Sequence, residues 1–134
     1  TVIEPAGGLT RTLFALLCAC YDEDEVNDTT RTIFRFDFNI APIQIGILPL
    51  SKKEELIEIS NKIKNILQEN YRTEIDVTQS IGKRYRRQDE IGTPYCITVD
   101  FDSLNDNAVT VRNRDTMNQK RVAITDLLGF FSNI

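Results

Sequence analysis

The stretch that decides the fold is residues 43–67, IQIGILPLSKKEELIEISNKIKNIL. Isoleucines alternate in its first five residues and Pro49 ends the segment, a pattern typical of a strand buried in a parallel sheet. Ser51 and Glu54 have the spacing of a capping box, in which the two side chains satisfy free backbone amides at a helix start. Apolar residues then recur every three or four positions to about residue 70, which predicts a helix with one buried face.

The chain after this helix adds further strands and helices. Strands are expected at 73–77, 95–101, 108–112 and 120–124, with a basic helix at 81–91 that ends at Gly92 and a final helix from about residue 125. The helical crossovers make the first strands parallel, and the turn-rich residues 103–107 predict an antiparallel hairpin. We therefore predict an α/β fold over residues 41–134, a small mixed five-stranded sheet with about three helices.

Residues 1–40 have a different sequence pattern from the rest of the chain, and we place a domain boundary near residue 41. Residues 1–3 read as a strand already under way, and residues 9–21 have the spacing of a buried helix. The acidic residues 22–28 are expected to be a solvated loop, and residues 31–38 alternate like a half-buried strand. Because residue 1 is not Met, we expect the chain to be part of a longer protein.

Composition excludes several kinds of chemistry. The 134 residues carry 16 basic and 20 acidic side chains, a formal charge of −4, and the whole acidic excess lies in residues 1–41. The absence of His removes Ser-His-Asp and Cys-His nucleophiles and His-containing zinc sites. No apolar run approaches the length of a membrane span, so no membrane association is expected. Three cysteines without a disulfide framework indicate a reducing compartment, which predicts a cytoplasmic location.

No metal site is predicted. Cys18 and Cys20 are interpreted as small apolar core or interface residues rather than metal ligands. Asp100, Asp102 and Asp106 lack the Gly and terminal Glu of a calcium loop, so they are interpreted as turn residues.

Two basic groups follow residue 80: Lys83, Arg84, Arg86 and Arg87 around Tyr85, and Arg112, Arg114, Lys120 and Arg121. Guanidinium groups bind phosphate oxygens bidentately, and a tyrosine ring can stack on an unpaired base. On a part of the chain without net charge, two such groups favour local recognition of single-stranded RNA. The alternative is a solvated basic face balanced by internal ion pairs, such as Arg87 with Asp89 or Glu90.

Several stretches together resemble one enzyme family. Residues 2–11, VIEPAGGLTR, resemble motif 3 of class II aminoacyl-tRNA synthetases, in the form found in homodimeric glycyl-tRNA synthetases. Residues 41–50 resemble the start of that family's C-terminal anticodon-binding domain. Residues 80–94, SIGKRYRRQDEIGTP, are the most specific match, and 99–102 and 109–117 follow in family order. The resemblance covers essentially the whole chain.

The resemblance implies a role for each part of the chain. Residues 1–40 would be a strand–helix remnant of the catalytic domain, and 41–134 the anticodon-binding domain. Arg11 matches the motif 3 arginine that contacts the ATP phosphates, and Glu4 the acidic residue that receives the glycine ammonium group, although Ala6 replaces the usual Ser and Thr10 the usual Gly. The residues expected to contact the anticodon are Arg84, Tyr85, Arg87, Arg112, Arg114 and Asp115.

The function implied is that of a glycine–tRNA ligase. The longer protein would be a homodimer that activates glycine with ATP and Mg²⁺ as substrates and charges tRNA(Gly). The 134-residue chain would be inactive alone, would hold neither ATP nor Mg²⁺, and would supply anticodon recognition, with no role in DNA binding. The alternatives are a non-enzymatic, synthetase-like accessory domain and another class II synthetase, for Thr, Pro or His.

Overall fold

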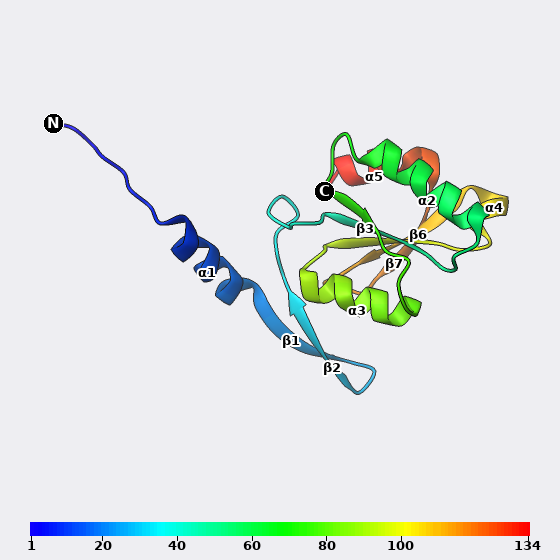
Figure 1. Ribbon diagram of the computed structural model, residues 1–134, viewed down its shortest axis with the longest axis horizontal. Helices are drawn as coiled ribbons and strands as arrows, with labels where there is room; N and C mark the ends of the chain where they lie inside the picture. Colours follow the sequence, from blue (N-terminus) through cyan, green and yellow to red (C-terminus); the bar gives the residue numbers. More distant parts are fainter.

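A five-stranded sheet forms the centre of the computed structural model, which describes residues 1–134 (Figure 1). The strand order is β4-β3-β5-β6-β7; β3 pairs in parallel with β4 and β5, and the two last strands are antiparallel. The strands are β3 (Ile45–Pro49), β4 (Thr73–Ile75), β5 (Tyr95–Val99), β6 (Ala108–Asn113) and β7 (Gln119–Ala123). The predicted mixed sheet of five strands is confirmed.

Helices cover both faces of the sheet. They are α2 (Glu54–Leu67), α3 (Ile81–Ile91), the single turn α4 (Ser103–Asp106) and α5 (Leu127–Ser132), which follows the 3₁₀ turn Ile124–Asp126. The chain leaves β3 toward β4 and then crosses back over β3 to β5. Because such crossovers are right-handed, the two moves place α2 and α3 on opposite faces, with α5 beside α2 (Figure 1).

The two faces of the sheet differ in polarity. The apolar core lies on the α2 and α5 side and consists of Ile45, Ile47, Leu56, Ile63, Leu67, Ile97, Val99, Val109, Val111, Val122, Leu127 and Phe131. On α3, the buried side chains are the polar Arg84, Gln88 and Asp89. The α3 side of the sheet is therefore held by hydrogen bonds and ion pairs, in addition to apolar contacts.

The capping box predicted at Ser51 and Glu54 is wrong. Helix α2 begins at Glu54, its N-cap is Lys53, and no side chain caps it. The Ser51 hydroxyl instead accepts a hydrogen bond from the Lys53 amide at 3.3 Å. The Ser therefore belongs to the turn before the helix, two residues before the N-cap position.

The first residues depart from the prediction in two ways. Residues 1–8 form no strand, and Val2 and Ile3 are each 90% exposed. Helix α1 (Leu9–Cys20) is confirmed, but none of its residues is buried, and Cys18 is exposed. In Figure 1 this segment projects away from the sheet, so the apolar side chains of α1 are only partly covered by the rest of the chain.

The acidic segment predicted to be a solvated loop is instead a strand. β1 (Tyr21–Val26) pairs antiparallel with β2 (Thr29–Phe34), and the hairpin lies below α3 in Figure 1. Asn27 and Asp28 both have positive φ, 52° and 58°, as a two-residue hairpin turn requires. Alternate residues of β1 are half-buried, and Asp24 opposes Arg31 across the ladder and pairs with it, so cross-strand charge pairing stabilises a strand where composition predicted a loop.

Gly92 joins α3 to β5 in the left-handed region, with φ +87°. A Cβ there would lie 2.9 Å from the Cβ of Phe34 and closer still to the Phe36 ring. We expect Gly92→Ala to lower the free energy of unfolding by about 3 kcal/mol, from backbone strain and overpacking together. Urea denaturation measures the change.

Gly129→Ala in α5 is the matched control, because its Cβ would meet nothing within 4 Å. The control is expected to be neutral or to stabilise the chain by up to about 1 kcal/mol. Equal effects of the two substitutions would contradict the role assigned to Gly92.

Candidate nucleic-acid interface

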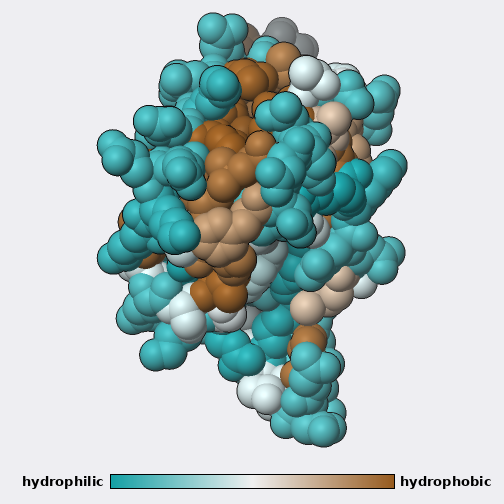
Figure 2. Space-filling model, turned by 90° about the vertical axis from the view of Figure 1, so that its right-hand side faces the viewer, coloured by the Kyte–Doolittle hydropathy of each residue, from teal (hydrophilic) through white to brown (hydrophobic).

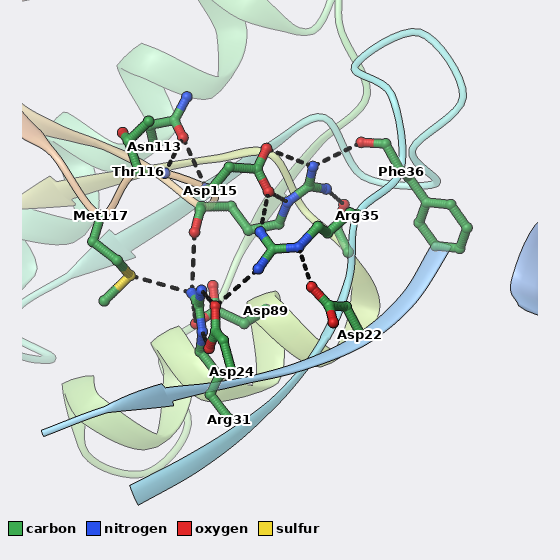
Figure 3. Close-up of polar contacts among 12 residues, drawn as sticks. Asp22, Asp24, Arg31, Arg35, Phe36, Asp89, Asn113, Asp115, Thr116 and Met117 are labelled. Atoms are coloured by element: carbon green, nitrogen blue, oxygen red, sulfur yellow. Dashed lines mark hydrogen bonds and ion pairs between the residues drawn. The ribbon is translucent and has the colours of Figure 1, made fainter. Parts of the chain in front are cut away.

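One buried carboxylate holds three elements together. Asp89 of α3 accepts hydrogen bonds from Arg31 of β2 at 3.2 Å and from Arg112 of β6 at 3.2 and 3.0 Å. Both guanidinium groups also lie against the Met117 sulfur, and Figure 3 shows this group beside the hairpin. All three charged residues, here called the Asp89 cluster, are at most 4% exposed. Arg112, predicted to contact RNA, is therefore engaged inside the chain.

A second ion-pair chain runs alongside the cluster. Arg114 donates to the carbonyls of Gly92 at 2.8 Å and Phe36 at 2.9 Å, and to the Asp115 carboxylate. Asp115 also accepts from Arg35 at 2.8 Å. Figure 3 shows Arg35 reaching from the hairpin toward both Asp115 and Asp22. The buried Arg114 guanidinium thus fixes the segment after β2, while the Asp115 carboxylate remains partly accessible.

The predicted RNA contacts on α3 are also bonded within the chain. Arg84 is buried and donates to the main-chain carbonyls of Pro49, Asp76 and Gln79. The half-buried Tyr85 shares a hydrogen bond with Thr98 through its hydroxyl group.

The rest of the α3 group is also engaged within the chain. The Arg112 guanidinium lies 4.5 Å from the centre of the Tyr85 ring. Arg87 is half-buried and pairs with Asp76, rather than with Asp89 or Glu90 as the sequence suggested. Direct contact of these residues with RNA stays a prediction.

Helical spacing explains which cations of α3 are buried. Arg84 and Gln88 continue a stripe that begins at Ile81 and ends at Ile91, so they face the sheet. Lys83 and Arg86 lie off that stripe, are exposed, and form no hydrogen bond or ion pair within the chain. The sequence places these two residues in the first basic group but not among the expected anticodon contacts, although the stripe itself is visible in the sequence.

The second basic group is largely neutralised. Arg121 pairs with Asp100 at 2.7 Å and with Asp106 at 2.9 Å. Asp100 also accepts from the amide and hydroxyl of Ser103, which is the turn chemistry expected of this segment. Lys120 makes no ion pair, and its ammonium group lies 5.8 Å from the centre of the Phe130 ring. Of the two basic groups, Lys83, Arg86 and Lys120 keep an exposed charge without an ion pair, while the buried Arg84 donates only to main-chain carbonyls.

An exposed apolar strip lies at the carboxyl ends of β3 and β5. Figure 2 faces this edge and shows apolar side chains between hydrophilic flanks. Leu50 follows β3, while Phe101 and Leu104 follow β5, and all three are 39–40% exposed. The ammonium group of Lys53 lies 4.8 Å from the centre of the Phe101 ring. Ligands of open α/β sheets bind where neighbouring strands send their connections in opposite directions, as these two strands do.

The two residues assigned to substrates lie on the projecting segment. Glu4 and Arg11 are exposed and form no side-chain hydrogen bond or ion pair in the chain. An open hollow beside Arg11 is lined by residues 8–11 and Phe14. The chain alone therefore does not assemble these two side chains into a site, and their roles with ATP and glycine stay predictions.

The remaining reactive groups form no further centre. No group of three or more Cys, Asp or Glu side chains is arranged to hold a metal ion. Burial raises the pKa of the Cys96 thiol to about 12, so this cysteine is protonated at neutral pH. None of the helices is long and apolar enough to cross a membrane.

Comparison with known proteins finds similarity along the whole chain. The family described as "Anticodon binding domain" matches residues 44–134. A glycine–tRNA ligase of Ruminiclostridium cellulolyticum is 55% identical over 98% of this chain, and one of Treponema denticola is 49% identical over 96%. The chain spans only 28% and 30% of the length of these two relatives.

Solved structures share the fold. A prolyl-tRNA synthetase of Cryptosporidium parvum superposes on 76% of this chain, using 22% of its own length, with a TM-score of 0.70 and 23% identity. The RNA-binding domain of a threonyl-tRNA synthetase from the same organism covers 74% of this chain and 25% of its own, with a TM-score of 0.67 and 24% identity.

The Asp89 cluster generates a stability prediction. Asp89→Asn leaves two buried guanidinium groups facing a neutral amide, and we expect a loss of about 3 kcal/mol in the free energy of unfolding, measured with urea. Glu90→Gln removes the same charge from the next residue, which is exposed and unpaired, and should cost less than about 0.5 kcal/mol. A similar loss in both variants would disprove the anchoring role.

The paired carboxylates generate a pH prediction. Burial acts to raise the pKa of Asp76, but hydrogen bonds from Thr78 and the charge of Arg87 outweigh it, so this pKa lies below its ordinary value. Arg121 and Ser103 likewise outweigh burial and lower the pKa of Asp100.

A lowered folded-state pKa contributes stability above the unfolded value, about 3.9, and that stability is lost as the pH falls through the folded value. We expect urea unfolding to give a constant free energy from about pH 7 to 5 and a steep fall below about pH 4. Asp76→Asn should be less stable at neutral pH but lose less between pH 5 and 3. A parallel acid loss in this variant would show that Asp76 contributes nothing to it.

Proposed function

The chain belongs to the family of anticodon-binding domains, and from that membership we propose that it is the tRNA-reading part of a glycine–tRNA ligase. The observation that carries this proposal is the extent of the similarity. Relatives named glycine–tRNA ligase match 96–98% of the chain, well beyond residues 44–134 of the family match. The likeness to prolyl- and threonyl-tRNA synthetases lies below 25% identity and supports the fold alone.

The activity of the longer protein follows as part of the proposal. It activates glycine with ATP and Mg²⁺, transfers the glycyl group to tRNA(Gly), and acts as a homodimer in the cytoplasm. Residues 1–40 complete its catalytic domain, where Arg11 contacts the ATP phosphates and Glu4 the glycine ammonium group. The exposure of both side chains, on a segment that projects from the sheet, supports a role in contacts outside this chain.

Residues 41–134 form the anticodon-binding domain, and we propose that the anticodon loop docks on the apolar strip at the carboxyl ends of β3 and β5. Phe101 offers an exposed ring on which an unpaired base can stack, and Lys53 beside it offers a cation for a phosphate. Such stacking contributes about 1–3 kcal/mol per base.

The six residues predicted from the sequence divide into two roles. Arg84, Arg112 and Arg114 are buried, and their guanidinium groups are engaged with carbonyls and carboxylates, so they position α3 and β6 beneath the RNA. The other three, Tyr85, Arg87 and Asp115, keep part of their side chain accessible and stay candidates for direct contact.

Binding to an anticodon stem-loop tests the proposal. The 134-residue chain should bind the stem-loop of tRNA(Gly) more tightly than those of tRNAs for Thr, Pro or His, in a fluorescence anisotropy assay with a salt series. Phe101→Ala should weaken binding about tenfold, and Lys53→Glu should weaken it and lower the salt slope by about one. In the longer protein, both variants should leave glycine-dependent ATP–pyrophosphate exchange unchanged.

Lys62→Glu is the matched control, because it makes the same charge change as Lys53→Glu but at an exposed position within α2. No RNA binding by the unaltered chain would refute the proposed function. Equal weakening by Lys62→Glu and Lys53→Glu would instead refute the docking edge.

A further inference from the structure

A cleft of about 300 Å³ lies between the tip of the β1–β2 hairpin and helix α3, away from the apolar strip. Its walls include Asn27 at the hairpin turn, Gly82 and Arg86 on α3, and Gln119 at the start of β7, and the Asp89 cluster forms its floor. We call this space the hairpin cleft. It lies between the two predicted domains, because Val26, Asn27 and Arg31 belong to residues 1–40 and its other lining residues to residues 41–134.

The hairpin cleft has one unpaired cation, at its rim. Its floor holds two guanidinium groups, of Arg31 and Arg112, on the single carboxylate of Asp89, and only Arg31 has a second carboxylate partner, Asp24. At the rim, Arg86 is exposed and makes no ion pair. An anionic group that enters the cleft therefore meets an unpaired cation without having to break an existing pair.

The uncharged side chains of the cleft are suited to binding a nucleic-acid base. The side-chain amides of Asn27 and Gln119 form no hydrogen bond within the chain, and each offers both a donor and an acceptor to a base edge. Val26 and Met117 add apolar surface beside them. The volume is at the lower end of the range for small-molecule sites, which limits the occupant to about one nucleotide.

We propose that the hairpin cleft binds one unpaired ribonucleotide of the bound RNA, with Arg86 on its phosphate and the amides of Asn27 and Gln119 on its base. This inference rests on the proposed function, which brings single-stranded RNA to this face. Helix α3 begins at the carboxyl edge of the sheet and runs along the cleft, so RNA docked at that edge can reach it (Figure 1). The ion pair between Arg31 and Asp89 holds the hairpin in place and so forms the cleft.

Nucleotide titration of the ¹⁵N-labelled chain tests the site directly. Each of the four ribonucleoside 5′-monophosphates is added, and we expect saturable shifts of the backbone amides of Asn27, Gly82 and Gln119. Arg86→Ala should weaken binding of these nucleotides about tenfold. Lys83→Ala removes the same charge from the same helix outside the cleft and should leave the affinity unchanged.

A second matched pair tests the base contact. Gln119→Ala should weaken nucleotide binding, while Asn118→Ala, which removes an exposed amide next to the cleft, should have no effect. Equal effects within either pair, or shifts confined to residues outside the cleft, would overturn the proposal. It would also be overturned if a glutamate-rich peptide shifted the cleft amides and the nucleotides did not.

The two proposals fail in different ways. If the chain binds the tRNA(Gly) stem-loop and no nucleotide shifts the cleft amides, the nucleotide site is wrong and the proposed function stands. If the chain binds no RNA, the proposed function fails and the site fails with it.

Discussion

The carboxylate of Asp89 is the group on which the arrangement of the α3 face depends. It is buried between two arginines that come from β2 and β6, so one side chain fixes a hairpin, a helix and a sheet relative to one another. Buried ion pairs add little net stability compared with apolar packing, because desolvation offsets most of their attraction. Their directional hydrogen bonds nevertheless allow very few alternative arrangements. The apolar core under α2 supplies most of the burial, and the Asp89 cluster determines where the hairpin lies.

The ion pairs around Asp89 bear on where the chain divides into separable parts. Composition places a boundary near residue 41, yet Arg31 and Arg35 bond to Asp89 and Asp115 across it, and Arg114 bonds back to the carbonyl of Phe36. We infer that the hairpin moves with the sheet as one body. The separable part is then α1 with the residues before it, which carry exposed apolar side chains and have few partners in this chain.

Local patterns in the sequence were sufficient to predict the sheet but not to predict the ion pairs. Alternating isoleucines, the Gly92 helix stop and the turn before β6 each act within a few residues, and each element was predicted correctly. The β1 strand was missed because its run of acidic residues is typical of a loop, and no local spacing indicates that Asp24 and Asp22 will pair with Arg31 and Arg35 of the returning chain. The partners of Asp89 lie 58 and 23 residues away, and no local spacing indicates which carboxylate an arginine will meet. The stripe from Ile81 to Ile91 did contain enough information to separate the buried Arg84 from the exposed Arg86.

Most arginines of the two basic groups are paired with carboxylates of the chain, and this affects how the surface of the chain can recognise RNA. Affinity for nucleic acid that comes from phosphate neutralisation grows with each free cation and carries no sequence information. Arg112, Arg114 and Arg121 contribute little of this kind, because their charges are already balanced within the chain. Selectivity then has to come from stacking, base-edge hydrogen bonds and shape, which operate on unpaired loop nucleotides. A surface with few free charges discriminates against non-cognate RNA because it does not hold every RNA by its backbone.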